Sequence, residues 1–403
     1  MNVDRRGAGQ RMASYRNIFL LACCQALLLT NAAGLIAMNG LVGYSLTDTK
    51  VLATFGATTY VLGSALSTMP MSLWMARVGR RRGFMAGALI NIGGCALAVI
   101  ALSIRSFALY CAATAIIGIY NAIGLQYRFA ATEVAASTDK ARAISLVLAG
   151  GIAGGFLGPA ITRWGKSLFA APFLGSFVLL AAVALVALAV QSLVDVPKPT
   201  AEERSGAARP LRTIVTQPVF VVAALSAGMG YGLMNLLMTA TPLAMDFCSL
   251  PYSAAAFVIS WHVVGMYAPG FVTGSLISRF GALRIIVAGC AVMAGGAVVA
   301  LNGVTFAHFV AALVLIGLGW NFMYTGGTAL LTEAYRPAEK ARAQGANDFI
   351  VFTIMGLSSF SSGALVSSAG WTTMNWGALP FLALVAGVVI WYARSPAPAV
   401  ARG

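Results

Sequence analysis

Charged residues are scarce in this chain: Asp, Glu, Lys and Arg together make up 9% of its 403 residues. Ordinary soluble domains carry roughly 25% charged residues. Apolar residues make up 59% of the chain, and a helix needs about 20 mostly apolar residues to cross the hydrocarbon core of a bilayer. The composition therefore excludes a water-soluble globular protein. It leaves room for about a dozen membrane spans joined by short loops.

Acidic residues are the rarer of the charged types, with 11 Asp and Glu against 26 Lys and Arg, for a formal net charge of +15. In a soluble chain such an excess would suggest a nucleic-acid partner. In a membrane protein, basic residues gather in cytoplasmic loops and beside lipid headgroups. We therefore expect the lipid bilayer as a partner and no nucleic acid.

Residues typical of metal and catalytic sites are also rare. The chain has two histidines, His262 and His308, and six cysteines without a C-x-x-C pair, so neither a zinc site nor a disulfide framework is predicted. It has no H-E-x-x-H or G-x-S-x-G motif. Ala160 replaces the first glycine that a phosphate-binding loop ending at Lys166 and Ser167 would need. We predict no metal, no cofactor and no enzymatic activity.

Apolar runs separated by short polar breaks predict twelve spans. The longest hydrophilic stretch, 195–217, contains prolines and charges of both signs, as is typical of a solvated linker. It divides the chain into an amino-terminal half, 1–194, and a carboxy-terminal half, 218–403. The predicted spans are approximately 17–40, 51–75, 84–103, 106–127, 143–163, 170–194, 218–244, 253–278, 283–303, 306–331, 344–368 and 372–393.

The distribution of basic residues predicts the orientation of the chain. By this span assignment, the termini, the linker and the loops on their side hold every Lys and Arg except Lys50, Arg105, Arg163 and Lys166. Cytoplasmic loops carry the excess of positive charge in multi-pass membrane proteins. We therefore expect both termini and the linker to be cytoplasmic, in a chain of the cytoplasmic (inner) membrane.

The two halves repeat each other in sequence. Thr132-Glu133, followed by Lys140-Ala141-Arg142-Ala143, recurs as Thr332-Glu333 followed by Lys340-Ala341-Arg342-Ala343. Duplication of a six-span unit in parallel orientation explains this symmetry, because an even number of crossings returns the chain to the same side.

These features resemble the major facilitator superfamily. The resemblance rests on twelve spans, two similar halves and a basic loop after span 2, where Arg77, Gly79, Arg80 and Arg81 match the family signature Gly-x-x-x-Asp-Arg-x-Gly-Arg-Arg. Ala76 replaces the Asp of that signature. The resemblance implies an all-α membrane protein whose twelve transmembrane helices form two pseudo-symmetric six-helix bundles that rock about a central site.

In the family, the missing Asp belongs to a charge network that holds the halves together on the cytoplasmic side. Asp348 lies just inside span 11, which in this fold abuts the loop after span 2. We hypothesise that one of the loop arginines, Arg77, Arg80 or Arg81, pairs with Asp348 or Glu133 when the cytoplasmic side is closed. The alternative is that these acids only neutralise neighbouring cations at helix ends, where such pairs contribute little.

Span 5 carries small residues at helical spacing. Gly154 and Gly158 are four residues apart, and Pro159 follows; such spacing lets helices approach closely in lipid, and proline kinks a helix. The resemblance implies a gating role at the moving seam between the halves, and static packing is the alternative. This stretch also resembles part of the signature of drug-exporting antiporters, but Ile161-Thr162 replaces its glycines, which favours uptake over export.

Polar and aromatic side chains at mid-depth of the spans are the candidate binding residues, because buried polar groups in membranes usually face a cavity or the bundle interior. Spans 1, 4, 7 and 10, which line the cavity in the family, hold most of them. Such a pocket suits a neutral or weakly charged organic molecule; alternatively, each amide bonds only a neighbouring helix. The candidates are Gln25, Asn31, Tyr120, Asn121, Tyr231, Asn235, His262, Trp320, Asn321 and Tyr324.

Two titratable groups inside spans, His262 and Asp348, are candidates for proton coupling; uniport and another coupling ion stay open. We predict a monomeric secondary transporter that moves a small organic solute, such as a nutrient or a vitamin-like or aromatic compound, by alternating access. Two alternatives remain. One is efflux of drugs or metabolites by proton antiport, and the other is a non-transporting sensor or scaffold on a transporter fold.

Overall fold

The computed structural model describes residues 2–48, 52, 55–197 and 208–395, most of which are α-helical. The amino-terminal half begins with one long helix and ends before the linker. Its elements are α1 (Asn2–Leu46), α2 (Phe55–Val78), α3 (Arg80–Ser103), α4 (Phe107–Gly124), α5 (Tyr127–Val134), the 3-10 turn η2 (Ser137–Asp139), α6 (Lys140–Ala149), α7 (Gly151–Gly165) and α8 (Leu174–Leu193).

The carboxy-terminal half follows the same order after a short helix in the linker. Its elements are α10 (Leu211–Val215), α11 (Pro218–Phe247), α12 (Tyr252–Tyr267), α13 (Gly270–Phe280), α14 (Ala282–Leu301), α15 (Phe306–Leu331), the 3-10 turn η3 (Pro337–Glu339) and α16 (Lys340–Arg394). Part of the predicted linker, 198–207, lies outside the described residues.

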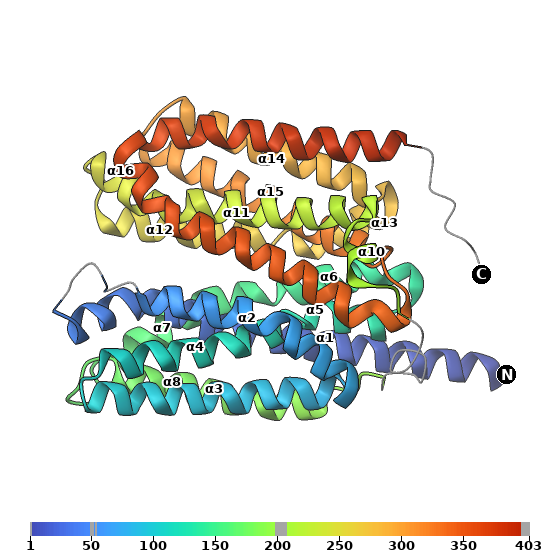
Figure 1. Ribbon diagram of the computed structural model, residues 1–403, viewed down its shortest axis with the longest axis horizontal. Coiled ribbons are helices and arrows are strands. Elements are labelled where there is room, and N and C mark those ends of the chain that lie inside the picture. The colour runs from blue at the N-terminus through green and yellow to red at the C-terminus, as the bar shows by residue number, and fades with distance from the viewer. Residues whose placement is uncertain (1, 49–51, 53–54, 198–207, 396–403) are drawn as a thin grey trace.

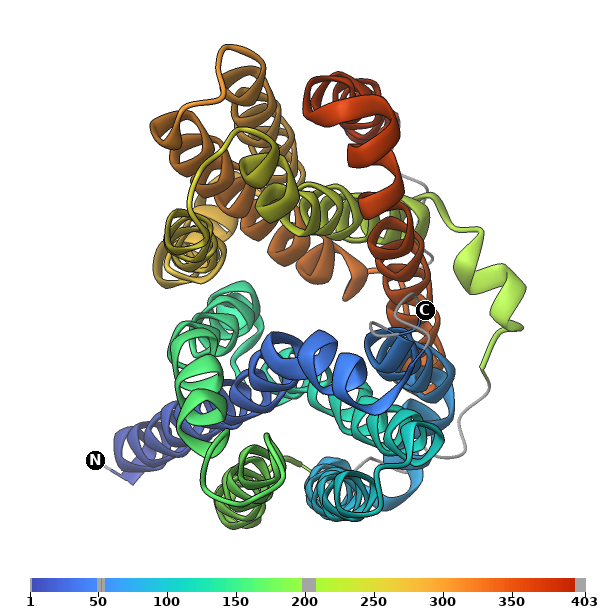
Figure 2. The same cartoon turned by 90° about the vertical axis from the view of Figure 1, so that its left-hand side faces the viewer.

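The helices form two bundles that lie side by side (Figure 1). Helices α1 to α8 make the first bundle and α11 to α16 the second, and a view along the helices shows the bundles facing each other across a seam (Figure 2). Apolar side chains such as Phe84 and Phe177 fill the interior of the first bundle, and Phe220 and Phe309 that of the second. The all-α, two-bundle architecture implied by the resemblance is confirmed.

Several spans consist of two helical pieces. Span 5 comprises α6 and α7, which meet at Gly150, and span 8 comprises α12 and α13, which meet at Pro269. Proline lacks a backbone N–H and cannot donate within a helix, which explains the second break. Spans 11 and 12 run together in α16 but are separated at Gly370, whose φ of 80° favours glycine.

Among the described residues, nine helical segments are long and apolar enough to cross a membrane. The three predicted spans outside this set are α2, the α12–α13 pair and the first part of α16. Contacts between Ser72 of α2 and Ala341 of α16, and between Gly274 of α13 and Arg142 of α6, place all three at the seam. One side of each of these three spans packs against the opposite bundle and not against lipid, so the spans can carry more polar residues than spans that face lipid.

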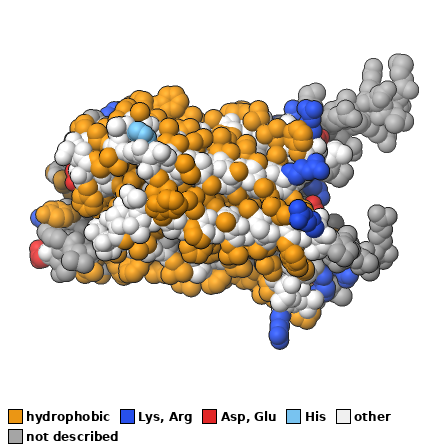
Figure 3. Space-filling model, turned by 90° about the horizontal axis from the view of Figure 1, so that it is seen from above, with side chains coloured by type: hydrophobic (Ala, Val, Ile, Leu, Met, Phe, Trp, Pro, Cys, Tyr) orange, Lys and Arg blue, Asp and Glu red, His pale blue; other side chains and the backbone are white. Residues whose placement is uncertain are grey.

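Basic side chains gather at one end of the molecule, and an apolar surface covers its length (Figure 3). We call this end, where α1 begins and α16 finishes, the basic end (Figure 1). Large apolar side chains on the outer surface are well exposed, including Leu66 at 69% and Phe360 at 84%. Such exposure is costly in water and ordinary in lipid, which identifies the chain as a multi-pass membrane protein.

Candidate functional site

Four aromatic side chains meet in the second bundle. Trp320 and Tyr324 lie one turn apart on α15 and stack, with ring centroids 5.1 Å apart and planes at 15°. Tyr231 of α11 packs edge-on against both at 5.3 Å. Tyr267, at the end of α12, packs edge-on against Trp320 at 5.5 Å. These four residues, here called the central aromatic cluster, are one stacked pair with two rings packed edge-on, and each ring carries a polar tip.

The first bundle contributes an arginine to this wall. The guanidinium carbon of Arg128, from α5, lies 4.5 Å from the centroid of the Tyr324 ring, a favourable arrangement for a cation. Gly151 of α7 also lies against this cluster, because a Cβ there would be 2.8 Å from the ring of Tyr267. The central aromatic cluster therefore lies at the seam, within reach of both bundles.

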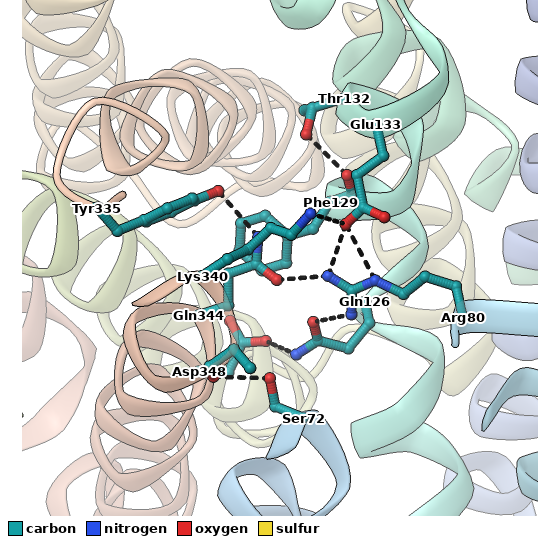
Figure 4. Close-up of polar contacts among 11 residues, drawn as sticks. Ser72, Arg80, Gln126, Phe129, Thr132, Glu133, Tyr335, Lys340, Gln344 and Asp348 are labelled. Carbon is teal, nitrogen blue, oxygen red and sulfur yellow. Dashed lines mark hydrogen bonds and ion pairs between the residues drawn. The ribbon is translucent and has the colours of Figure 1, made fainter. Parts of the chain in front are cut away.

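Arg128 and Asp348 form a buried ion pair that joins the bundles. Arg128 Nη2 donates to Asp348 Oδ1, and each side chain is 1% exposed. Gln126 donates to the other carboxylate oxygen of Asp348 at 3.1 Å, as Figure 4 shows, and Asn347 donates to Oδ1 at 3.1 Å. Both charges are removed from water, so each depends on the other.

A second group of side chains, here called the gate network, lies beside this pair (Figure 4). Arg80 donates to Glu133 Oε1 from Nε at 3.0 Å and from Nη2 at 2.8 Å. Its Nη1 donates to Gln126 at 3.0 Å, and its Nη2 reaches across the seam to Gln344 at 2.7 Å. Lys340, also from α16, lies 3.3 Å from the Glu133 carboxylate. The gate network therefore cross-links the two bundles near the basic end.

Backbone contacts close the same end. The Ser72 hydroxyl of α2 donates to the Ala341 carbonyl at 2.8 Å. The Ser145 hydroxyl of α6 donates to the Gly270 carbonyl and accepts from the Gly274 N–H at 3.0 Å. The bundles thus touch through main-chain atoms on two sides of the gate network, and the basic end is closed in this structure.

The loop signature places its residues in different environments. Arg80 is buried and pairs with Glu133, whereas Arg77 and Arg81 are exposed. Gly79 has a φ of 90°, a conformation that favours glycine, and allows α3 to begin directly after α2. Asp348 takes Arg128 as its ion-pair partner instead of a loop arginine.

The predicted binding amides bond to helices of their own bundle. These bonds are Asn31 with Asn91, Asn121 with Ser64, Asn235 with Ser358, and Asn321 with Thr273. Gln25 is buried, and Tyr120 packs in the core of the first bundle. Of the predicted binding residues, Tyr231, Trp320 and Tyr324 are the ones whose rings are in mutual contact.

His262 lies between two helices of the second bundle. Its Nδ1 donates to the Leu313 carbonyl of α15 at 2.6 Å, and the side chain is fully buried. That contact does not cross the seam. Of the two titratable candidates, Asp348 is the one whose ion pair joins the bundles.

The span 5 glycines act mainly within the first bundle. A Cβ on Gly154 would lie 2.4 Å from the Ala26 carbonyl, and one on Gly158 would lie 2.5 Å from the Thr30 carbonyl, so both allow α7 to pack closely against α1. Pro159 lies inside α7. The glycines of this span that face the second bundle are Gly151, toward Tyr267, and Gly155, toward Val263.

Sequence reasoning missed Arg128 and Tyr267. The predicted span 106–127 leaves Arg128 in the loop that follows, but the helical path continues through α5 to Val134. The span can continue because Asp348, 220 positions away, balances the Arg128 charge. The apolar triplet that follows Arg128, Phe129 to Ala131, was the available sign that the span had not ended.

Comparison with known proteins gives consistent results along the whole chain. The family model "Major Facilitator Superfamily" matches residues 18–299 and 235–402. The riboflavin transporter RfnT of Brucella anthropi is 39% identical over 378 residues, which cover 93% of this chain and 94% of that protein. The uncharacterized MFS-type transporter YddS of Bacillus subtilis is 28% identical, over 89% of this chain and 86% of its own length.

Solved structures show the same fold. The transporter FucP in its outward conformation superposes with a TM-score of 0.77 at 13% identity, over 94% of this chain and 99% of FucP. A bacterial homologue of the iron transporter ferroportin, in an outward-facing state, gives a TM-score of 0.74 at 12% identity, over the same shares. The chain therefore belongs to the Major Facilitator Superfamily and is a secondary transporter of that family.

Proposed function

We propose that this transporter imports riboflavin or a closely related flat heteroaromatic nutrient. The central aromatic cluster carries the proposal, because aromatic rings with polar tips gathered at the seam are the kind of lining that binds a planar ring system. The similarity to a riboflavin transporter across nearly the whole chain supports it. Arg128 adds polar atoms beside the aromatic wall, as a heteroaromatic ring with carbonyl groups requires.

The proposed mechanism is alternating access by a monomer of the cytoplasmic (inner) membrane, with both termini cytoplasmic. The excess of positive charge at the basic end supports this orientation. With the basic end closed, solute would reach the central aromatic cluster from the opposite, outer side. Release would then require separation of the gate network and of the backbone contacts between α2 and α16 and between α6 and α13.

We further propose that a proton drives uptake through Asp348. This carboxylate belongs to the buried ion pair between the bundles, so adding a proton to it would remove the charge that holds Arg128. His262 is the second candidate. Accumulation of radiolabelled riboflavin in proteoliposomes should rise with an imposed inward proton gradient and fall when an ionophore dissipates that gradient.

The test of the proposed function measures riboflavin binding to the purified full-length protein and riboflavin uptake in proteoliposomes, with Trp320→Leu as the site variant. Loss of one aromatic stacking partner is expected to weaken riboflavin binding roughly tenfold or more. Trp391→Leu is the matched control, because that side chain is 62% exposed on the outer surface. Equal binding by wild type and Trp320→Leu would contradict the proposed site, and wild-type protein that neither binds nor transports riboflavin would contradict the proposed substrate.

A further inference from the structure

Buried polar atoms without partners gather around Tyr324. Among the described residues, no hydrogen-bond partner is found for Arg128 Nε and Nη1, Trp320 Nε1 or the Tyr324 hydroxyl. All three side chains are at most 1% exposed. A buried donor without an acceptor is costly, so most are satisfied in folded proteins. Arg128 and Trp320 both lie against the Tyr324 ring, so a ligand bound among these three side chains would supply the missing acceptors.

We propose that Arg128 is a substrate-binding residue that donates from Nε or Nη1 to a carbonyl oxygen or ring nitrogen on the edge of a neutral heteroaromatic solute, which lies against the central aromatic cluster. This inference rests on the proposed function and adds the chemistry by which the solute is selected. The geometry supports it: Arg128 extends from the first bundle over Tyr324 of the second, so a bound solute would contact both halves.

The charge balance around Arg128 favours a neutral acceptor over an anion. Asp348 already occupies Nη2 and neutralises the guanidinium. Gln126 and Asn347 hold that carboxylate by hydrogen bonds at 3.1 Å. The Nε and Nη1 groups of Arg128 therefore remain as hydrogen-bond donors, and the ion pair as a whole carries no excess charge. A carbonyl edge satisfies such donors, and an anionic group would add an uncompensated charge to a buried site.

Arg80 shows what a fully satisfied arginine looks like at the same seam. Its Nε, Nη1 and Nη2 all donate, to Glu133, Gln126 and Gln344. Each guanidinium nitrogen of Arg80 therefore has a hydrogen-bond partner within the protein, whereas Nε and Nη1 of Arg128 have none among the described residues. Lysine cannot replace either residue fully, because an ammonium lacks the planar guanidinium that fixes the directions of the N–H groups. This difference separates a binding role from a structural one.

The test measures riboflavin binding to purified full-length protein by quenching of flavin fluorescence. Arg128→Lys keeps the charge that Asp348 requires and removes the Nε and Nη1 donors of the guanidinium, so we expect riboflavin to bind roughly ten- to a hundred-fold more weakly. Arg82→Lys, at an exposed position, is the matched control and should bind as wild type does. Thermal unfolding of each variant in the absence of riboflavin shows whether the fold is retained.

A ligand series separates hydrogen bonding from a structural effect. The 2-thio and 4-thio analogues of riboflavin each replace one carbonyl oxygen by sulfur, a weak acceptor. We expect wild type to bind at least one analogue roughly tenfold more weakly than riboflavin, and Arg128→Lys to discriminate less than about threefold. A purely structural role for Arg128 would weaken all three ligands equally and leave the discrimination unchanged.

The outcomes separate this inference from the proposed function. If wild type binds riboflavin and Arg128→Lys binds it equally well, or discriminates the thio analogues equally, the role of Arg128 is wrong and the proposed function stands. If the phosphorylated flavin binds more tightly than riboflavin and loses this advantage in Arg128→Lys, the site selects an anion and the inference is overturned. If wild type binds no flavin, the proposed function itself fails.

Discussion

Substituting Gly274 with alanine should favour opening of the basic end without disrupting either bundle. Gly274 lies on α13 where it crosses α6 of the other bundle. A Cβ at this position would lie 2.4 Å from Arg142 Cα and 2.7 Å from the Ala141 carbonyl oxygen. Both are main-chain atoms and cannot rotate away, so the bundles must separate locally to admit the methyl group.

The cost of this clash falls on one conformation. Extra volume in a well-packed contact typically costs about 1–3 kcal/mol. The neighbours of Gly274 belong to the opposite bundle, so the cost arises when the basic end is closed and is relieved when the bundles separate. The equilibrium should then shift about 5- to 150-fold toward the form in which the basic end is open.

The assay is pulsed electron paramagnetic resonance between spin labels on Asp139 and Arg279, exposed positions on opposite bundles beside this contact. Labels on non-canonical amino acids avoid reaction with the six native cysteines. Gly274→Ala should lengthen the distance distribution and slow riboflavin uptake. Gly295→Ala is the control, because its Cβ would meet nothing within 4 Å. A distribution for Gly274→Ala that matches both wild type and the control would refute the reasoning.

Three other changes test the gate, the packing and the linker. Glu133→Gln removes the negative charge that lies 3.3 Å from Lys340 across the seam. Loss of this ion pair should destabilise the closed form by about 1–2 kcal/mol and lengthen the distance between the same two spin labels. An unchanged label distance would contradict this prediction. Gly154→Val should lower the Tm because its Cβ would lie 2.4 Å from the backbone of α1, whereas Gly93→Val, with open space around its Cβ, should not. Hydrogen bonds from Arg209 and from backbone N–H groups lower the pKa of Glu339, outside the spans, from 4.5 to about 2. A carboxylate whose pKa is lowered on folding stabilises the folded state at pH values above its unfolded pKa, and this stabilisation is lost as the pH falls toward the folded pKa. Hydrogen-exchange protection of 208–217 should therefore stay constant from pH 7 to 5 and decline below about 4.5. In Glu339→Gln this protection should already be lost at pH 7.

Composition and periodicity were sufficient to predict the membrane class and the helical architecture. The backbone N–H and C=O groups of a span must form hydrogen bonds within the span, and its side chains must be apolar where they contact lipid. Each span is therefore recognisable in the sequence as a run of about 20 mostly apolar residues. The recurrence of Thr132-Glu133 as Thr332-Glu333 indicated the duplication. The break in span 8 at Pro269 is likewise a local property of the chain.

The site was predicted only in part. The rule that polar side chains at mid-depth of a span face a cavity or the bundle interior identifies Tyr231, Trp320 and Tyr324, and their rings do meet. The amides were identified by the same rule, yet Asn31 and Asn321 bond to neighbouring helices of their own bundle. Polarity inside a span signals an interior partner, and sequence does not say whether that partner is a helix or a solute.

Only the tertiary structure decided which charges pair. In sequence, Arg128 is one of several basic residues near the end of a span, and Asp348 lies 220 positions away. Local patterns report on residues within a few turns, whereas an ion pair between bundles depends on how the two halves pack against each other. The sequence by itself therefore determined a twelve-span transporter with a duplicated half. The packing of the two halves determined that Arg80 bonds to Gln344 across the seam and that Arg128, with two donor nitrogens unpartnered among the described residues, lies beside the central aromatic cluster.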